Sequence, residues 1–86
     1  MNLIKVSTTS RTAAVAGSIA KTIREHQRAE VQTIGAGSVN QAIKALVLAK
    51  SYLAEEDVHI VFYPEFVDVE IEGKIRTAIK LVVEPR

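Results

Sequence analysis

Hydrophobic and polar positions alternate in two different periods, and the changes of period divide the chain into six segments. Leu3 to Ser7 alternates as a short strand, and from Arg11 apolar residues recur every three or four positions over about four helical turns. A second strand is predicted over Glu30 to Gly35, and a second helix from Ser38 to about Leu53. The rest of the chain alternates on both sides of Gly73, which indicates a long β-hairpin.

This order, β-α-β-α-β-β, predicts an α+β fold in which a four-stranded mixed sheet carries two helices on one face. The connection through the first helix is expected to be right-handed. We expect one domain over residues 1–86, because 86 residues leave no room for a second core. A domain of this size is marginally stable or gains stability by oligomerising.

The turn at Gly73 sets the register of the hairpin. A two-residue loop would place apolar side chains opposite polar ones. A three-residue loop with a bulge instead pairs Ile71 with Ile75, and Glu70 with Arg76. The pattern therefore favours the longer loop.

The second helix carries two apolar stripes. The main stripe runs from Val39 to Leu53 and faces the sheet. The other lies roughly opposite on the helical wheel and consists of Gln41, Ala45, Leu48 and Tyr52. One sheet cannot cover both, so we expect the second stripe to be a partner surface, most simply the same helix of another subunit in a homodimer. An extended loop packed on the stripe is the alternative.

The stretch from Ile34 to Lys44 turns a strand into a helix through two glycines. Ser38 is a candidate N-cap, with Gln41 at the spacing of a capping box. The positive end of the helix dipole can receive an anion, and Gly35 and Gly37 let a phosphate approach the backbone. A tight turn without a ligand is the alternative.

Both strand-to-helix turns follow parallel strands, so they are expected at the same edge of the sheet, where open α/β sheets bind ligands. There the turns are expected to converge on a phosphate or carboxylate, with Lys44 one turn further along the helix. The polar and glycine residues concerned are Ser7, Thr8, Thr9, Ser10, Arg11, Gly35, Gly37, Ser38, Asn40 and Gln41. Plain helix capping is the alternative role, and Thr8, Thr9 and Ser10 have hydroxyls suited to it.

Charge is unevenly distributed. Residues 1–50 hold seven basic and two acidic residues, whereas residues 51–86 hold four basic and eight acidic residues. Such a division marks a nucleic-acid-binding face, or two halves that attract each other. The pI of about 8.1 is below that of a typical DNA-packaging protein, so any phosphate binding would be local.

Catalytic and metal chemistry have little support. The chain has no cysteine, and neither His26 nor His59 has a zinc-site spacing. The G-x-G lacks the third glycine of a dinucleotide site and the lysine of a P-loop. We therefore expect no enzyme activity, metal or cofactor. No signal peptide or apolar run of ~20 residues is present, so a soluble cytoplasmic protein without a membrane partner is expected.

Several segments resemble the bacterial stage V sporulation protein S family essentially from end to end. They are Leu3 to Ser7, Val15-Ala16-Gly17, Ile34 to Gly37 followed by Asn40-Gln41-Ala42, and the terminal segment Arg76 to Arg86. This family is similar to the archaeal chromatin protein Alba, which has a βαβαββ fold. The resemblance implies a single Alba-like domain and a small nucleic-acid-binding regulator of sporulation, septation or development.

Alba-like proteins dimerise and hold nucleic acid with both strand-to-helix loops and the extended hairpin. Carried over, this implies contacts from Thr8 to Arg11, from Gly35 to Asn40, and from Lys74 and Arg76 near the hairpin tip. Thr8-Thr9-Ser10 stands where Alba proteins carry a lysine pair, Ala36 stands where they carry arginine, and the hairpin is acidic. Weak binding of DNA or RNA is therefore expected. The alternative is a protein-assembly or small-anion-sensing module that binds no nucleic acid.

Overall fold

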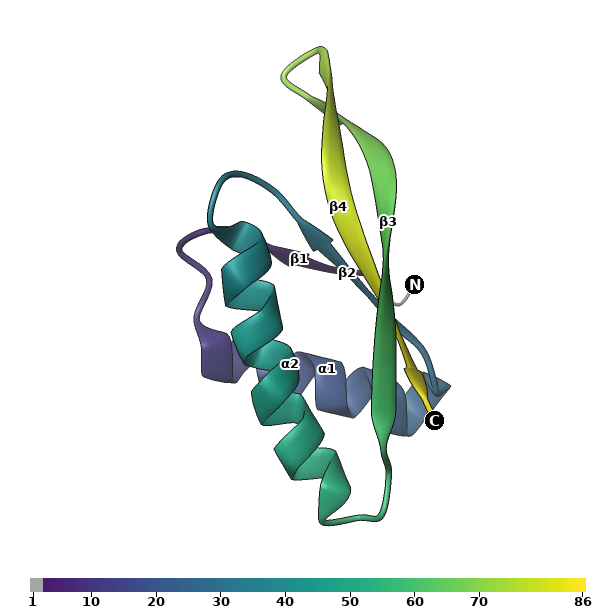
Figure 1. Cartoon of the computed structure of the whole chain (residues 1–86). Coiled ribbons are helices and arrows are strands. Elements are labelled where there is room, and N and C mark those ends of the chain that lie inside the picture. Colours follow the sequence, from purple (N-terminus) through teal and green to yellow (C-terminus); the bar gives the residue numbers. More distant parts are fainter. Residues whose placement is uncertain (1–2) are drawn as a thin grey trace.

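The computed structural model describes residues 3–86 and contains four strands and two helices (Figure 1). In chain order these are β1 (Leu3–Val6), α1 (Thr12–His26), β2 (Ala29–Thr33), α2 (Ser38–Ala54), β3 (Ile60–Ile71) and β4 (Lys74–Pro85). The strands form one sheet in the order β1-β2-β4-β3, with β1 parallel to β2 and the other pairs antiparallel. The predicted order of elements and the mixed sheet are confirmed.

A single hydrophobic core lies between one face of the sheet and the two helices. Val31 of β2 pairs with Leu81 of β4, and alternation points both side chains toward the helices, where both are buried. The helices add apolar side chains to the same cluster, which include Ala16, Ile19, Ile23, Ala42, Leu46, Ala49 and Leu53. The many alanines on the facing sides of α1 and α2 let the crossed helices pack closely.

Helix α1 covers part of the second stripe of α2. Ala45 is fully buried and belongs to the core cluster, and Leu48 is half-buried against that cluster. The prediction that Ala45 offers a surface to a partner is therefore wrong, because it counted the sheet as the only cover and left out the other helix. Gln41 is half-buried, whereas Tyr52 remains 39% exposed.

The β3–β4 turn has two residues, so the predicted three-residue loop is wrong. Glu72 and Gly73 both have positive φ angles, 52° and 77°, as in a type I′ turn. Such a turn matches the right-handed twist of its strands. It pairs Val69 with Arg76, and Glu70 with Ile75, so apolar residues do stand opposite charged ones.

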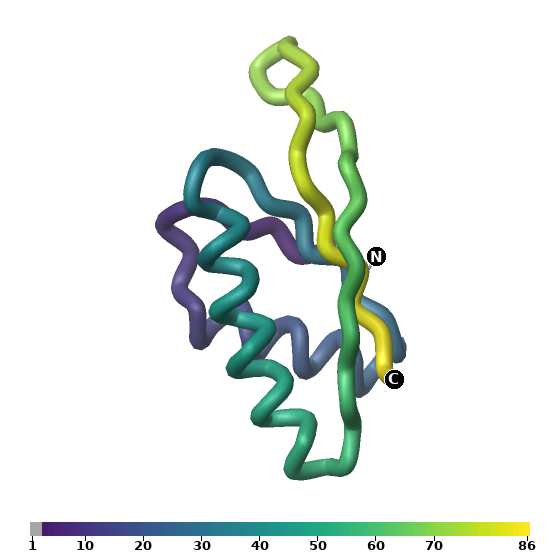
Figure 2. Tube along the Cα trace, viewed as in Figure 1, coloured from purple at the N-terminus to yellow at the C-terminus, as the bar shows by residue number. Residues whose placement is uncertain are grey.

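Beyond the pair Thr33–Ile79 strand β2 ends, and residues 67–78 continue as a two-stranded ribbon, here called the arm. The arm projects past both helices (Figures 1 and 2). Its register defines two faces. The basic face holds Val67, Val69, Ile71, Lys74, Arg76 and Ala78, and the acidic face holds Asp68, Glu70, Ile75 and Thr77. The arm therefore separates its basic and acidic side chains.

The turn predicts that Glu72→Asn stabilises the protein. A glutamate in the left-handed region is strained, whereas asparagine adopts this conformation readily. We expect the free energy of unfolding in urea to rise by about 0.5–1 kcal/mol. Glu70→Asn, in extended backbone two residues earlier, is the matched control and gives no gain. An unchanged urea midpoint for Glu72→Asn would contradict the assigned turn.

Candidate nucleic-acid interface

The two strand-to-helix loops lie side by side and are tied together by hydrogen bonds (Figure 1). The hydroxyl of Thr8 donates to the carbonyl of Ala36, and the side-chain amide of Gln41 donates to the carbonyl of Ser10 at 2.9 Å. These bonds join residues about thirty positions apart in the sequence. The loop before α1 and the glycine turn before α2 therefore form one surface.

The predicted capping box of α2 is wrong. The N-cap residue is Gly37, whose φ of 83° favours a glycine and which has no side chain that can cap. Ser38 is the first helical residue, is buried, and donates from its hydroxyl to the carbonyl of Gly35 at 2.5 Å. Gln41 binds the other loop instead of its own helix end.

The hydroxyls before α1 do not cap that helix either. Ser10 Oγ accepts from the backbone N–H of Ser7 at 2.9 Å, and Thr8 binds Ala36. Arg11 is the N-cap residue, so the helix begins at Thr12 and not at Arg11 as predicted. Within residues 3–86, neither helix has a side-chain cap. The N–H of Ser38 donates to the carbonyl of Gly35 at 3.2 Å, and the N–H groups of the following residues of α2 and of the first residues of α1 are left for an external acceptor.

The Gln41–Ser10 hydrogen bond joins the first turn of α2 to the loop before α1, but the two helices start at different heights and run in clearly different directions (Figure 1). Each end therefore directs its N–H groups along its own axis. Most of the hydroxyls expected to meet the anion, and the Gln41 amide, are engaged within the protein. Convergence of all these groups on one anion stays a prediction, and the geometry favours two adjacent anion positions.

A cleft of about 290 Å³ separates the arm from the glycine turn. Gly35 and Val39 line it from the body of the protein, and Val69 and Arg76 line it from the arm. Arg76 and the glycine turn, both predicted to contact nucleic acid, are thus brought together. Sequence reasoning missed that Val69 and Arg76 share this wall, because the predicted three-residue loop paired Arg76 with Glu70.

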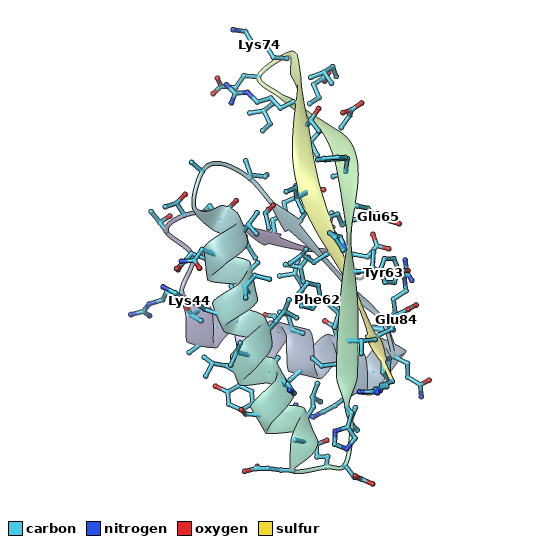
Figure 3. The ribbon with its side chains drawn as sticks, in the orientation of Figure 1. Lys44, Phe62, Tyr63, Glu65, Lys74 and Glu84 are labelled. Carbon is cyan, nitrogen blue, oxygen red and sulfur yellow. The ribbon has the colours of Figure 1, made fainter. Side chains whose placement is uncertain are left out.

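The remaining predicted residues are spread over the molecule. Lys44 extends on the side of α2 away from the hairpin, next to the first loop, whereas Lys74 lies at the tip of the arm (Figure 3). Thr9 and Asn40 are exposed. The structure therefore brings together the two loops and Arg76, and leaves Lys74 at a distance from them.

The basic residues of this surface are not neutralised by the protein. Across residues 3–86, no carboxylate lies within 4.0 Å of the charged groups of Arg11, Lys44, Lys74 or Arg76. All four residues are exposed. They are free to pair with an anion from outside the chain, which is what phosphate contacts require.

Other basic residues are held in ion pairs on the opposite face of the sheet, where Figure 3 shows Tyr63, Glu65 and Glu84. Arg28 binds Glu84 at 3.0 Å and Glu30 at 3.3 Å, and Lys80 binds Glu30 at 3.2 Å and Glu65 at 3.5 Å. Hydrogen bonds from Lys80, and then from Arg28, hold the pKa of Glu30 below its ordinary value. The bond to Glu30 raises the pKa of Lys80.

A similar pair lies at the far end of the helices. Arg24 binds Glu56 at 2.5 Å, and the pair lowers the pKa of Glu56 while it raises that of Arg24. Arg24, Arg28 and Lys80 therefore have internal partners. Within the described part of the chain, no three His, Asp or Glu side chains gather as metal ligands would. No helix there is long and apolar enough to cross a membrane.

The sequence also matches a known family. A family model described as Stage V sporulation protein S (SpoVS) matches residues 2–86. The matched span includes both loops, the arm and every residue of the candidate interface. The match thus covers all of the geometry described above.

The ion pairs of Glu30 predict a specific acid sensitivity. A carboxyl group whose pKa is lowered by folding contributes stability above its ordinary value of 4.5, and this stability is lost as pH falls through the folded value. We expect Glu30→Gln to cost no more than about 1 kcal/mol near pH 7, and the cost to shrink below about pH 4.5. Urea unfolding across pH 3–7 measures this. Glu25→Gln is the control, because Glu25 forms no ion pair within residues 3–86. An equal pH slope in the wild type, Glu30→Gln and Glu25→Gln would exclude the effect.

Proposed function

The chain belongs to the stage V sporulation protein S family, and on this basis we propose that its sporulation-related role is exercised by binding nucleic acid. It acts as a non-enzymatic regulatory protein, as a cytoplasmic homodimer, and binds DNA or RNA weakly. The observation that carries the proposal is the pair of adjacent helix ends without side-chain caps, beside exposed and unpaired basic residues.

Phosphate is the chemistry that fits these helix ends. Free N–H groups at a helix start, together with the helix dipole, bind anions without a dedicated side chain. Arg11 stands at the start of α1, and Lys44 lies two turns into α2. Two adjacent anion positions match a polyanion, which presents phosphates in a row, better than they match a single small anion.

The arm adds a second contact region. Its basic face carries Lys74 and Arg76 beside Val69 and Ile71, and Arg76 lines the cleft next to the glycine turn. Arginine and apolar side chains together suit a nucleic-acid groove. With few cationic contacts in each subunit, affinity depends on salt and on a second subunit that doubles the contacts.

A second candidate function is assembly or sensing of a small anion without nucleic acid. The observation that favours it is the cleft of about 290 Å³ beside the open end of α2, a volume near the lower end of the range of small-ligand sites. Under this alternative, wild-type protein shifts no nucleic acid in a gel at low salt.

The proposal predicts that the double variant Arg11→Glu/Lys44→Glu binds nucleic acid at least about tenfold more weakly near 50 mM salt. Each lost phosphate contact also flattens the dependence of log affinity on log salt by about 0.9 for duplex DNA. Fluorescence anisotropy with a labelled duplex and a labelled single strand measures both.

Lys21→Glu, which reverses an exposed and unpaired lysine on α1, is the matched control and changes little. Unchanged affinity and slope in the double variant would remove Arg11 and Lys44 from the interface. Absence of any wild-type binding at low salt would overturn nucleic-acid binding altogether.

A further inference from the structure

Strand β4 has a free backbone edge along the arm, on the side away from β3. Its partner on that side, β2, ends with the pair Thr33–Ile79, and the hydroxyl of Thr33 also donates to the carbonyl of Ile79 at 2.8 Å. The backbone groups of Ile79 therefore point toward β2. Because these groups alternate in direction along a strand, the N–H and C=O of Thr77 and Ile75 point to the same side, where β2 no longer runs.

The chain after β2 does not supply the missing partner. Gly35 is the next residue whose backbone would face β4, but its φ of 91° turns the chain toward α2. Its carbonyl instead accepts from the N–H of Ser38 at 3.2 Å and from the Ser38 hydroxyl at 2.5 Å. Within residues 3–86, no other backbone group binds Ile75 or Thr77 on this side. Figure 1 shows the loop after β2 leading away from β4.

The cleft between the arm and the glycine turn lies along this free edge. Thr77 and Ile79 line it from β4, Gly35 lines it from the turn, and Val39 lines it from α2. Arg76 lines it as well, from the basic face of the arm. The cleft of about 290 Å³ thus occupies the place that a longer β2 would fill.

A strand added at this edge would meet two kinds of side chain, because residues directly opposite each other in a sheet share a face. An added residue opposite Thr77 lies on the same side of the sheet as Ile79, which is apolar. Added residues opposite Lys74 and Arg76 lie on the basic face. Within the described residues 3–86, no carboxylate lies within 4.0 Å of either cation. The edge therefore suits a segment in which acidic and apolar residues alternate.

We propose that an extended segment of a partner protein, with alternating acidic and apolar residues, pairs with β4 at Ile75 and Thr77. Strand addition of this kind takes its affinity from main-chain hydrogen bonds and its selectivity from alternate side chains. The acidic residues pair with Lys74 and Arg76, which the proposed function assigns to nucleic acid. A partner bound here competes with nucleic acid for the arm, so the inference goes beyond the proposed function and does not depend on it.

A labelled short peptide in which glutamate and valine alternate tests the pairing by fluorescence anisotropy with the whole chain. We expect a matched lysine–valine peptide to bind at least about tenfold more weakly, because it brings like charges to Lys74 and Arg76. A glutamate–valine peptide with N-methylvaline at each valine keeps its charges and side chains but loses the donors that face β4. This peptide is also expected to bind at least about tenfold more weakly.

Variants of the chain locate the site. Thr77→Pro removes an N–H of the free edge and none that pairs with β3, so the hairpin keeps its ladder and the glutamate–valine peptide binds at least about tenfold more weakly. The double variant Lys74→Glu/Arg76→Glu reverses the preference and binds the lysine–valine peptide more tightly than the glutamate–valine peptide. Lys21→Glu, an exposed position on α1, is the matched control and leaves both affinities unchanged.

Amide hydrogen exchange, followed by nuclear magnetic resonance, detects the added strand directly. In the free protein the N–H groups of Ile75 and Thr77 face solvent, whereas that of Arg76 pairs with β3. We expect the glutamate–valine peptide to slow exchange at Ile75 and Thr77 by at least about tenfold.

Three results would overturn the proposal. Equal affinity for the N-methylated peptide would mean a contact between charges without a strand. Peptide binding that leaves exchange at Ile75 and Thr77 unchanged would place the peptide elsewhere. Protection of these two amides by a nucleic acid, with no peptide bound by the chain, would assign the cleft to nucleic acid. Nucleic-acid binding by the loops is judged separately, by the anisotropy of the Arg11→Glu/Lys44→Glu variant.

Discussion

The hydrogen bonds between the two strand-to-helix loops are the interaction on which the candidate interface depends. Thr8 of the first loop donates a side-chain hydrogen bond to a carbonyl of the glycine turn, and Gln41 of the first turn of α2 donates one to a carbonyl of the first loop. A group that binds across to the neighbouring loop cannot also cap its own helix. These bonds bring the loops together. The helix ends are open because their N-cap residues, Arg11 and Gly37, form no side-chain cap, and an open helix end is a position where an anion is favoured.

Hydrophobic periodicity predicted the helices and strands of this fold. The predictions for the capping box and for Ala45 were wrong because they depend on contacts between segments distant in the sequence. The strand and helix order follows from local hydrophobic spacing, which each segment carries by itself. The spacing of Ser38 and Gln41 satisfies a capping box, but it contains no information about a carbonyl of Ser10 that folding brings within 2.9 Å. Ala45 was misassigned for the same reason, since the helix that packs against α2 there is α1, an earlier segment of the chain.

The arm shows a local prediction overruled by backbone geometry. Matching apolar with apolar across the hairpin favoured three loop residues, yet the twist of a long ribbon favours the two-residue turn at Glu72 and Gly73. The cost is a glutamate in the left-handed region and mixed cross-strand pairs. The same register places Lys74 and Arg76 on one face and Asp68 and Glu70 on the other. This separation, which the net charge does not reveal, leaves the basic face of the arm without Asp68 and Glu70.

Salt acts differently on the charged and the apolar residues of the arm. Contacts proposed for Lys74 and Arg76 weaken as ionic strength rises, because exposed charges are screened over about 8 Å at physiological salt. Val69 and Ile71, which share the basic face of the arm, are apolar, and a contact through them is not screened. At the loops, the groups available to the proposed ligand are backbone amides and basic side chains. Rising salt should therefore weaken the proposed contacts at the loops before it weakens those at the arm.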